Sequence, residues 1–303
     1  MSKHILITGG TGLIGKKLTK RLLEDGYTVS HLSRSPGTDP RVATYLWDIN
    51  KGQVDEHCID GVDTVIHLAG TGIADSRWTE KRKQDIIDSR VKSIALIYDL
   101  LKRTTQHTVK NVISASGVGY YSDRGDDIMT ETCAPAHDFM GKCCVDWENA
   151  VGEGEQLGLR VVKFRTGVVL STKGGALPKL AAPVKLGLGA ALGSGKQWMP
   201  WIHERDVIDM YIFALNNPEL TGVYNMAAPE PVTNKQLTKA IADVLKRPYW
   251  LPNVPAFALK LAMGEMATVV LGSTKTSAKK IKAAGFSFSY PEVTAALKHL
   301  YKL

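Results

Sequence analysis

The feature that most constrains this chain is a glycine pattern that directly follows its first apolar run. Residues 4–8 read HILIT, as expected of a buried strand, and residues 13–26 have the apolar spacing of a helix. The turn between them reads TGGTGLIG. In such a turn Gly9 permits the sharp bend, Gly12 lets a pyrophosphate approach the backbone, and Gly15 lets the helix pack close to the strand. The pattern predicts a dinucleotide-binding βα unit whose helix N-terminus attracts an anion.

The end of the second predicted strand indicates which dinucleotide is preferred. Residues 27–33 read YTVSHLS, and Arg34 follows them. An NAD-binding site usually has an acidic residue here that binds the ribose 2′-hydroxyl, whereas arginine suits a 2′-phosphate. No acid occupies positions 30–35, and a guanidinium makes charge-assisted hydrogen bonds to phosphate. We therefore predict NADP(H) over NAD(H), with a plain surface charge at Arg34 as the alternative.

Strand-like and helical segments alternate through the first half of the chain. Strands are expected over residues 63–70 and 111–116, with a long polar helix over 79–104 between them. A helix over 139–157 then precedes a strand over 160–170. Strands separated by helices predict a parallel sheet that is covered on both faces. The expected fold class is α/β, with a Rossmann-type doubly wound parallel sheet.

The rhythm changes in the second half. Long glycine-rich loops with a helix follow the last predicted strand, then a helix over 203–217 and a short alternating segment over 285–290 that is typical of a strand. We predict an NADP(H)-binding domain over residues 1–170 and a smaller C-terminal α+β substrate region over 171–303. Later segments are expected to return to the first domain.

Charge and cysteine content limit the partners. The net charge of +8 favours an anionic partner, either nucleic acid or a phosphorylated small molecule. The densest basic cluster, over residues 275–282, has no interleaved aromatics and no nucleic-acid motif, so we expect a solvated helix face and no nucleic-acid binding. Cys143 and Cys144 are adjacent and no Cys-x-x-Cys pair exists, which predicts reduced thiols and no metal site.

No segment has the pattern of a membrane span. The most apolar later stretch, residues 254–272, is interrupted by Lys260 and Glu265, whereas a spanning helix needs ~20 mostly apolar residues. The first apolar run leads straight into glycines and lacks the longer apolar region of a signal peptide. We expect a cytoplasmic protein that acts on a small-molecule substrate, and the sequence leaves open whether it forms a homodimer.

Several motifs together resemble a known superfamily. The loop TGGTGLIG, HLAG (67–70) and SAS (114–116) are similar to the extended short-chain dehydrogenases/reductases. Further segments narrow the resemblance: SRVKS (89–93), GVGYYSD (117–123), WE (147–148), RTGVVL (165–170), GSGKQWMPWIHERD (193–206), GVYNMAAPEPVTN (222–234) and AAGFSFSYPEVTAAL (283–297). This set resembles the atypical, epimerase-like subfamily, also labelled SulA-like cell-division inhibitor homologues, whose members carry a small family-specific C-terminal domain. The resemblance covers essentially the whole chain.

The resemblance implies cofactor contacts at matching positions. Residues of the glycine loop would hold the pyrophosphate: Gly9, Thr11, Gly12, Leu13 and Ile14. Residues at the end of the second strand would hold the 2′-phosphate: Ser33 and Arg34. The adenosine and its ribose would contact Leu68, Ala69 and Gly70, with Arg90 as a further cofactor contact. The nicotinamide would be flanked by Val168 and Val169.

The resemblance also shows what is missing. Enzymes of this superfamily usually pair a serine with Tyr-x-x-x-Lys, in which the tyrosine exchanges the proton and the nearby ammonium lowers its pKa. Ser116 ends its strand where the family places the serine, but the helix that contains DFMGKCCVDWE has no tyrosine. Depending on the register, Phe139 and Cys143 or Met140 and Cys144 occupy the positions of the pair.

Other groups are candidates for the proton exchange. Tyr120 and Tyr121 directly follow the Ser116 strand, at the edge of the sheet where ligands bind. His203 lies in a segment that relatives fold over the substrate site, and histidine exchanges protons near neutral pH. Each has an alternative role, because the tyrosines can simply pack the pocket and His203 can cap the helix that contains Asp206. We predict Ser116, Tyr120 and His203 as the catalytic set.

Two functions remain open from the sequence. The first is an NADP(H)-dependent oxidoreductase or nucleotide-sugar-epimerase-like enzyme with a non-standard proton donor. The second is a non-catalytic NADP(H)-binding protein that senses redox state or regulates a partner. Turnover with carbonyl compounds or nucleotide sugars separates them.

Overall fold

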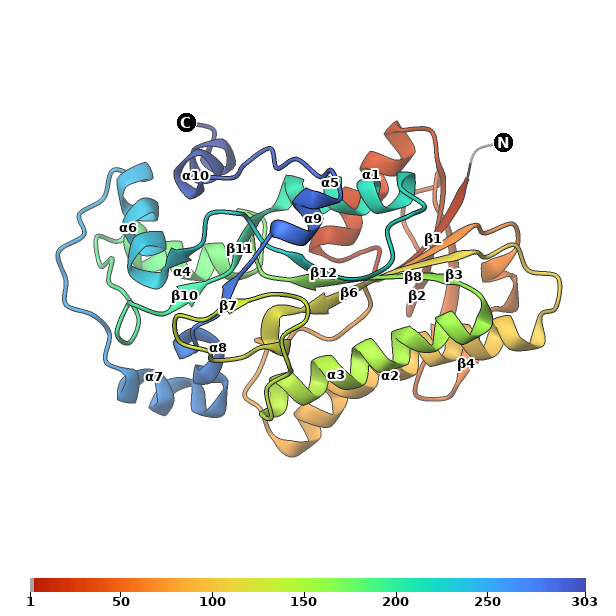
Figure 1. Ribbon diagram of the computed structural model, residues 1–303, viewed down its shortest axis with the longest axis horizontal. Helices are drawn as coiled ribbons and strands as arrows, with labels where there is room; N and C mark the ends of the chain where they lie inside the picture. The colour runs from red at the N-terminus through yellow and green to blue at the C-terminus, as the bar shows by residue number, and fades with distance from the viewer. Residues whose placement is uncertain (1–2) are drawn as a thin grey trace.

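The computed structural model describes residues 3–303 and is built on an eight-stranded sheet with the order β12-β8-β6-β5-β1-β2-β3-β4 (Figure 1). Neighbouring strands are parallel except β3 and β4. The strands are β1 (His4–Thr8), β2 (Thr28–Ser33), β3 (Ala43–Asp48), β4 (Gln53–Val54), β5 (Thr64–His67), β6 (Asn111–Gly117), β8 (Arg160–Thr166) and β12 (Gly222–Met226). The strand order reverses between β1 and β5, as at the ligand-binding crevice of doubly wound sheets.

Helices cover both faces of this sheet. Helices α1 (Leu13–Glu24) and α5 (Glu204–Asn216) lie on one face, and α2 (Glu80–Arg103) and α3 (Phe139–Gly152) lie on the other (Figure 1). Strand β1 shows why both faces are apolar: Ile5 and Ile7 belong to the core under α1 and α5, while the intervening Leu6 belongs to the core over α2 and α3. The predicted α/β class with a doubly wound parallel sheet is confirmed.

The C-terminal part adds a third core and three small sheets. Its helices are α4 (Ala176–Lys185), α6 (Asn234–Val244), α7 (Ala256–Met263), α8 (Thr268–Leu271), α9 (Lys279–Ala283) and α10 (Val293–Tyr301). The two-stranded sheets are β9 (Val168–Leu170) with β11 (Trp201–His203), β10 (Trp198–Met199) with β13 (Val232–Thr233), and β7 (Ile128–Met129) with β14 (Lys275–Thr276). No helix within residues 3–303 is both long and apolar enough to cross a bilayer.

A segment from beyond the predicted domain boundary joins the sheet of the first part. Strand β12 comes from the later part of the chain and pairs with β8 at the edge of the large sheet. The division at residue 170 stays a prediction.

Two predicted elements are wrong in detail. The strand expected over 160–170 is interrupted at Gly167, where a Cβ atom would lie 2.3 Å from the carbonyl oxygen of Pro200, and its two halves join different sheets. The segment 285–290 is not a strand. Phe286 and Phe288 alternate because they pack on the core, and the backbone N–H groups that follow donate to the Asp206 carboxylate instead of to a neighbouring strand.

Candidate cofactor cleft and adjoining pocket

A cleft opens at the carboxyl ends of β1, β2 and β5, where the sequence predicted the dinucleotide site. It has a volume of about 260 Å³. Most of the predicted cofactor residues line it: Gly9, Thr11, Gly12, Ser33, Arg34, Leu68, Ala69 and Gly70. The predicted set lacks several other residues of its wall, among them His31, Trp47, Ile49, Thr71 and Ser89.

The glycine loop leaves the start of α1 free to bind an anion. Gly9 has φ +69°, and a Cβ on it would lie 2.9 Å from the carbonyl carbon of Leu68, so this turn requires glycine. Gly12 begins α1 without a side-chain cap, and the first turn of this helix carries no acidic residue. The N–H groups of Leu13 and Ile14 therefore remain available at the positive end of the helix dipole, which fits a pyrophosphate.

The close approach at Gly15 gives a testable prediction. A Cβ there would lie 2.3 Å from the carbonyl oxygen of Gly9 and 2.6 Å from the Cα of Gly10. Gly15→Ala is expected to lower the free energy of unfolding by about 1–3 kcal/mol, because backbone must move to admit the methyl group. Urea unfolding measures it. Gly174→Ala, whose Cβ has its nearest neighbour at an ordinary 3.6 Å, is the control.

Arg34 stands at the outer end of the cleft. It is exposed, lines the cleft together with Ser33 and Trp47, and also borders a second cavity that contains Asp48. The contact of Arg34 with a 2′-phosphate stays a prediction.

Arg90 lies behind the cleft rather than in its wall. Its guanidinium donates to the backbone carbonyls of Ile86 and Thr71 at 2.8 and 3.1 Å and stacks on the Trp147 ring at 5.0 Å. It lies so close to Gly70 that a Cβ there would be 3.1 Å from the Arg90 Cζ. Arg90 therefore positions the Gly70–Thr71 backbone that borders the cleft, and its direct contact with a cofactor stays a prediction.

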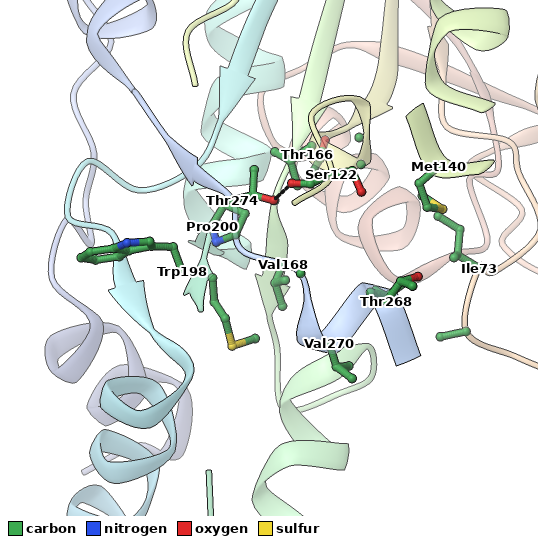
Figure 2. A pocket seen from close by; sticks show the side chains of 18 residues that line it. Ile73, Ser122, Met140, Thr166, Val168, Trp198, Pro200, Thr268, Val270 and Thr274 are labelled. Atoms are coloured by element: carbon green, nitrogen blue, oxygen red, sulfur yellow. Dashed lines mark hydrogen bonds between the residues drawn. The ribbon is translucent and has the colours of Figure 1, made fainter. Parts of the chain in front are cut away.

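A second pocket of about 260 Å³ lies at the carboxyl ends of β6 and β8 and beside β9 (Figure 2). Its lining includes Gly117–Gly119, Thr166 and Gly167, together with the side chains of Met140, Val168 and Trp198. Val168 lines this pocket, and its place beside the nicotinamide stays a prediction. Val169 points away, because alternate residues of β9 face opposite sides, and it packs against the main core.

The structure settles the register of the helix without a catalytic tyrosine. A Cβ on Gly119 would lie 2.7 Å from the Cε of Met140 and 3.7 Å from the Sγ of Cys144, so these two side chains face the end of β6. Phe139 instead packs edge-on against Trp78, with ring centroids 4.8 Å apart. Met140 and Cys144 therefore occupy the positions that the resemblance assigns to tyrosine and lysine.

Neither the nearby lysine nor the thiols replace that pair. Lys142 is exposed and pairs with Asp146 along the helix at 3.0 Å. Burial raises the pKa of the thiols of Cys143 and Cys144, which keeps them protonated and poorly nucleophilic.

Ser116 belongs to a buried charged network. Its hydroxyl donates to Glu148 Oε1 at 2.7 Å, and Glu148 accepts two hydrogen bonds from Arg165, both 2.8 Å long. Burial alone would lower the pKa of Arg165, but the hydrogen bonds and charge of Glu148 outweigh it and raise that pKa. Arg165 also donates to the Tyr121 hydroxyl at 2.9 Å. The Ser116 hydroxyl thus has a partner inside the protein.

Tyr120 covers the same arginine. The Arg165 Cζ lies 3.3 Å from the centroid of the Tyr120 ring, a cation–π contact. Its neighbour Tyr121 is fully buried, and burial raises the pKa of that phenol to about 12. The side chains of both tyrosines pack around Arg165, and neither residue lines the apolar pocket.

His203 lies elsewhere. It is fully buried at the start of α5, where its Nδ1 accepts a hydrogen bond from the Arg205 N–H at 2.9 Å. Its Nε2 lies 3.1 Å from His299 Nδ1, and its ring stacks on Tyr290. The structure therefore shows the helix cap that the sequence offered as the alternative role, and it does not bring Ser116, Tyr120 and His203 to one site.

The environment of His203 predicts a pH dependence. Burial, followed by the neighbouring His299, lowers the pKa of His203 to about 4 from 6.5. Below pH 6.5 the unfolded chain takes up a proton that the folded protein refuses, so stability falls as the pH falls from 6.5 to 4. His203→Asn keeps a cap and removes this proton, so it should reduce the slope by up to about 1.4 kcal/mol per pH unit. Urea unfolding of the variant and of the parent protein at several pH values measures it.

Sequence reasoning missed Ser122 and the ionic partners of Ser116. Ser122 lines the apolar pocket (Figure 2) with φ +53°, a conformation that is uncommon outside glycine. Its hydroxyl donates to the carboxylate of Asp138, the N-cap of α3. The sequence contains the motifs WE (147–148) and RTGVVL (165–170), but only the fold shows that Glu148 of the first pairs with Arg165 of the second.

The fold and the site have the features of a nucleotide-binding protein of the short-chain dehydrogenase/reductase type. These features are the doubly wound sheet, the glycine loop before the uncapped N-terminus of α1, and the pocket beside the cleft. The model of the NAD dependent epimerase/dehydratase family matches residues 5–227, and that of a domain of unknown function, DUF1731, matches residues 254–300. The chain belongs to the NAD dependent epimerase/dehydratase family, in the branch with this C-terminal domain.

Individual relatives are similar to this chain over nearly its full length. Epimerase family protein YfhF of Bacillus subtilis is 38% identical over 299 residues, which are 98% of this chain and 97% of that protein. A crystal structure of human epimerase family protein SDR39U1 with NADPH is 30% identical, with a TM-score of 0.86 and 99% of both chains covered. The nucleoside-diphosphate sugar epimerase from Corynebacterium glutamicum is 32% identical with a TM-score of 0.80, covering 99% of this chain and 58% of that one.

Proposed function

We propose that this protein binds NADP(H) in the glycine-loop cleft and acts as an oxidoreductase or epimerase-like enzyme on a small molecule in the adjoining pocket. The observation that carries the proposal is the placement of a bare α1 N-terminus and an exposed Arg34 around a cleft, with a separate pocket at the carboxyl ends of the next strands. The structure of human SDR39U1 with NADPH, which this chain matches over 99% of its length, supports the choice of dinucleotide.

The chain's own residues have distinct roles in this proposal. The glycine loop and the N–H groups of Leu13 and Ile14 hold the pyrophosphate, and Ser33 and Arg34 hold the 2′-phosphate. A bound NADP(H) supplies the hydride or accepts it. Ser122 and Thr166 are hydroxyl-bearing residues of the pocket.

The origin of the proton differs from the usual enzyme of this type. With Met140 and Cys144 in place of the tyrosine and lysine, a water molecule must exchange the proton with the substrate oxygen. The catalytic roles of Ser116, Tyr120 and His203 stay predictions. Ser116 and Tyr120 contact the Glu148–Arg165 pair, which does not line the pocket, so any effect of theirs on the reaction would be indirect.

One observation favours a second function. Among residues 3–303, none of those that line the pocket is an acid, a base, a lysine or an arginine, so the pocket wall itself offers no group that titrates near neutral pH. The alternative is a non-catalytic NADP(H)-binding protein that senses or reports redox state. A cytoplasmic location and self-association remain expectations under either function.

Two measurements test the proposal in sequence. Titration of the purified protein with NADPH and NADH, followed by calorimetry, is expected to show tighter binding of NADPH. The NADPH complex is then mixed with carbonyl compounds and with nucleotide sugars while NADPH absorbance is followed. Oxidation of NADPH by any of them supports an oxidoreductase, and conversion of a nucleotide sugar without net NADPH oxidation supports an epimerase. Tight binding with neither outcome supports the non-catalytic alternative, and failure to bind NADPH contradicts all of these functions.

A further inference from the structure

The wall of the pocket beside the cleft has an unusual chemistry for a nucleotide-sugar enzyme. Its side chains are apolar or hydroxyl-bearing, and no charged residue of the described chain lines it (Figure 2). A diphosphate needs arginine, lysine or free N–H donors, because burying an unpaired anion costs several kcal/mol or more. Large apolar groups form most of the surface instead: Ile73, Met140, Val168, Trp198, Met199 and Val270.

The four hydroxyl groups of the wall already donate their hydrogens to the protein. Thr274 donates to the backbone carbonyl of Ser122 at 2.6 Å, and Ser122 donates to the Asp138 carboxylate. Thr166 and Thr268 donate to backbone carbonyls at 3.1 and 2.8 Å. Each oxygen therefore offers lone pairs to a ligand. These oxygens can accept a hydrogen bond from a substrate hydroxyl or from a bound water, and they would repel a phosphate.

Basic side chains around the pocket are engaged with other groups. Arg77 donates to two carbonyls at the end of α7, at 2.8 and 3.0 Å, and Lys83 pairs with Glu265 at 2.6 Å. The ammonium of Lys275 lies over the Trp198 ring, 4.1 Å from its centroid. Using any of them for a phosphate would break an interaction that the side chain already makes.

The rim and the size of the pocket also favour a small apolar ligand. Val269 lines the pocket and is 48% exposed, and Val270 beside it lines the pocket as well. The pocket is therefore apolar on the side of α8. A volume of about 260 Å³ is below the ~300–1,000 Å³ that drug-sized ligands occupy.

From this chemistry we infer that the pocket takes a small, uncharged, mainly apolar alcohol or its aldehyde or ketone, and that it excludes nucleoside diphosphate sugars. The inference rests on the proposed function and deepens it by naming the substrate class. In the reaction, a hydride passes between the substrate carbon and NADP(H), and the substrate oxygen gains or loses its proton through a bound water that donates to the wall hydroxyl oxygens.

Calorimetry tests the inference without relying on turnover. The full chain is first titrated with NADP+ alone, so that a failure of the proposed cofactor site is seen separately. The NADP+-saturated protein, which cannot reduce a carbonyl, is then titrated with benzaldehyde, with cyclohexanone and with UDP-glucose. We expect at least one of the two carbonyl compounds to bind at least about tenfold more tightly than UDP-glucose.

Variants locate the binding. Met140→Asp places a carboxylate in the apolar wall and is expected to weaken the carbonyl compounds at least about tenfold. Leu186→Asp, at a side chain that is 77% exposed and outside the pocket, should leave their affinity unchanged. Val270→Asp replaces Met140→Asp if that variant does not melt cooperatively. Tighter binding of UDP-glucose, no carbonyl binding to the NADP+ complex, or affinity unchanged by both pocket variants overturns the inference.

Discussion

Replacing Glu148 with alanine is expected to lower the free energy of unfolding by about 3–5 kcal/mol, because it leaves a buried arginine charge without its partner. Glu148 and Arg165 are only 7% and 3% exposed, and two hydrogen bonds join them. Solvent therefore cannot take over the role of the carboxylate. The Ser116 hydroxyl and the Arg165 guanidinium would both lose an acceptor. Urea unfolding of the variant and the parent protein measures the loss.

An exposed ion pair on the same helix provides the matched control. Lys142 and Asp146 lie 3.0 Å apart, and the lysine side chain is 68% exposed. Lys142→Ala should change stability by no more than about 0.5 kcal/mol, because water screens such a pair. Equal losses for the two variants would show that the buried network does not stabilise the fold as its geometry indicates.

Replacing Arg34 with glutamate is expected to weaken NADPH binding about 100-fold. Charge-assisted hydrogen bonds to a phosphate contribute about 1.5–3 kcal/mol, and the new carboxylate would repel the 2′-phosphate as well. NADH lacks that phosphate, so its affinity should change little. Calorimetric titration of both dinucleotides with the variant gives the two ratios.

A distant basic residue separates local from general charge effects. Arg103 at the end of α2 pairs with Glu56 at 3.2 Å and does not line the cleft. Arg103→Glu makes the same change in net charge and should leave NADPH affinity within about twofold, since exposed charges farther apart than ~10 Å are largely screened. Unchanged NADPH affinity in Arg34→Glu would remove the basis for the predicted preference for NADP(H).

The sequence predicted the parts of the fold that depend on local pattern. The strand over 4–8 and the glycine turn after it could be predicted directly, because an apolar run and a glycine determine the backbone conformation of the residues next to them. The segment 285–290 misled the same reasoning. Alternation says only that every second side chain is buried, and Phe286 and Phe288 meet that condition by packing on the core without a partner strand.

The pocket could not be predicted to the same degree, because its wall comes from segments far apart in the chain. Gly117, Met140, Val168, Trp198 and Val270 meet only once the sheet and the C-terminal part are in place. Each residue along a helix turns the side-chain direction by about 100°, so a shift of one decides between Phe139 and Met140. The role of His203 was equally open, since one imidazole can cap a helix or exchange a proton.

Asn225 has a consequence for the order in which the chain can fold. This buried side chain on β12 accepts a hydrogen bond from Tyr121 at 2.8 Å and donates to the carbonyls of Met129 and Ser277, each at 3.1 Å. Strands β6 and β8 can pair as soon as both have left the ribosome, but this amide is satisfied only after residue 277 has arrived. The large sheet therefore completes its buried hydrogen bonds only when a segment synthesised near the end of the chain has arrived.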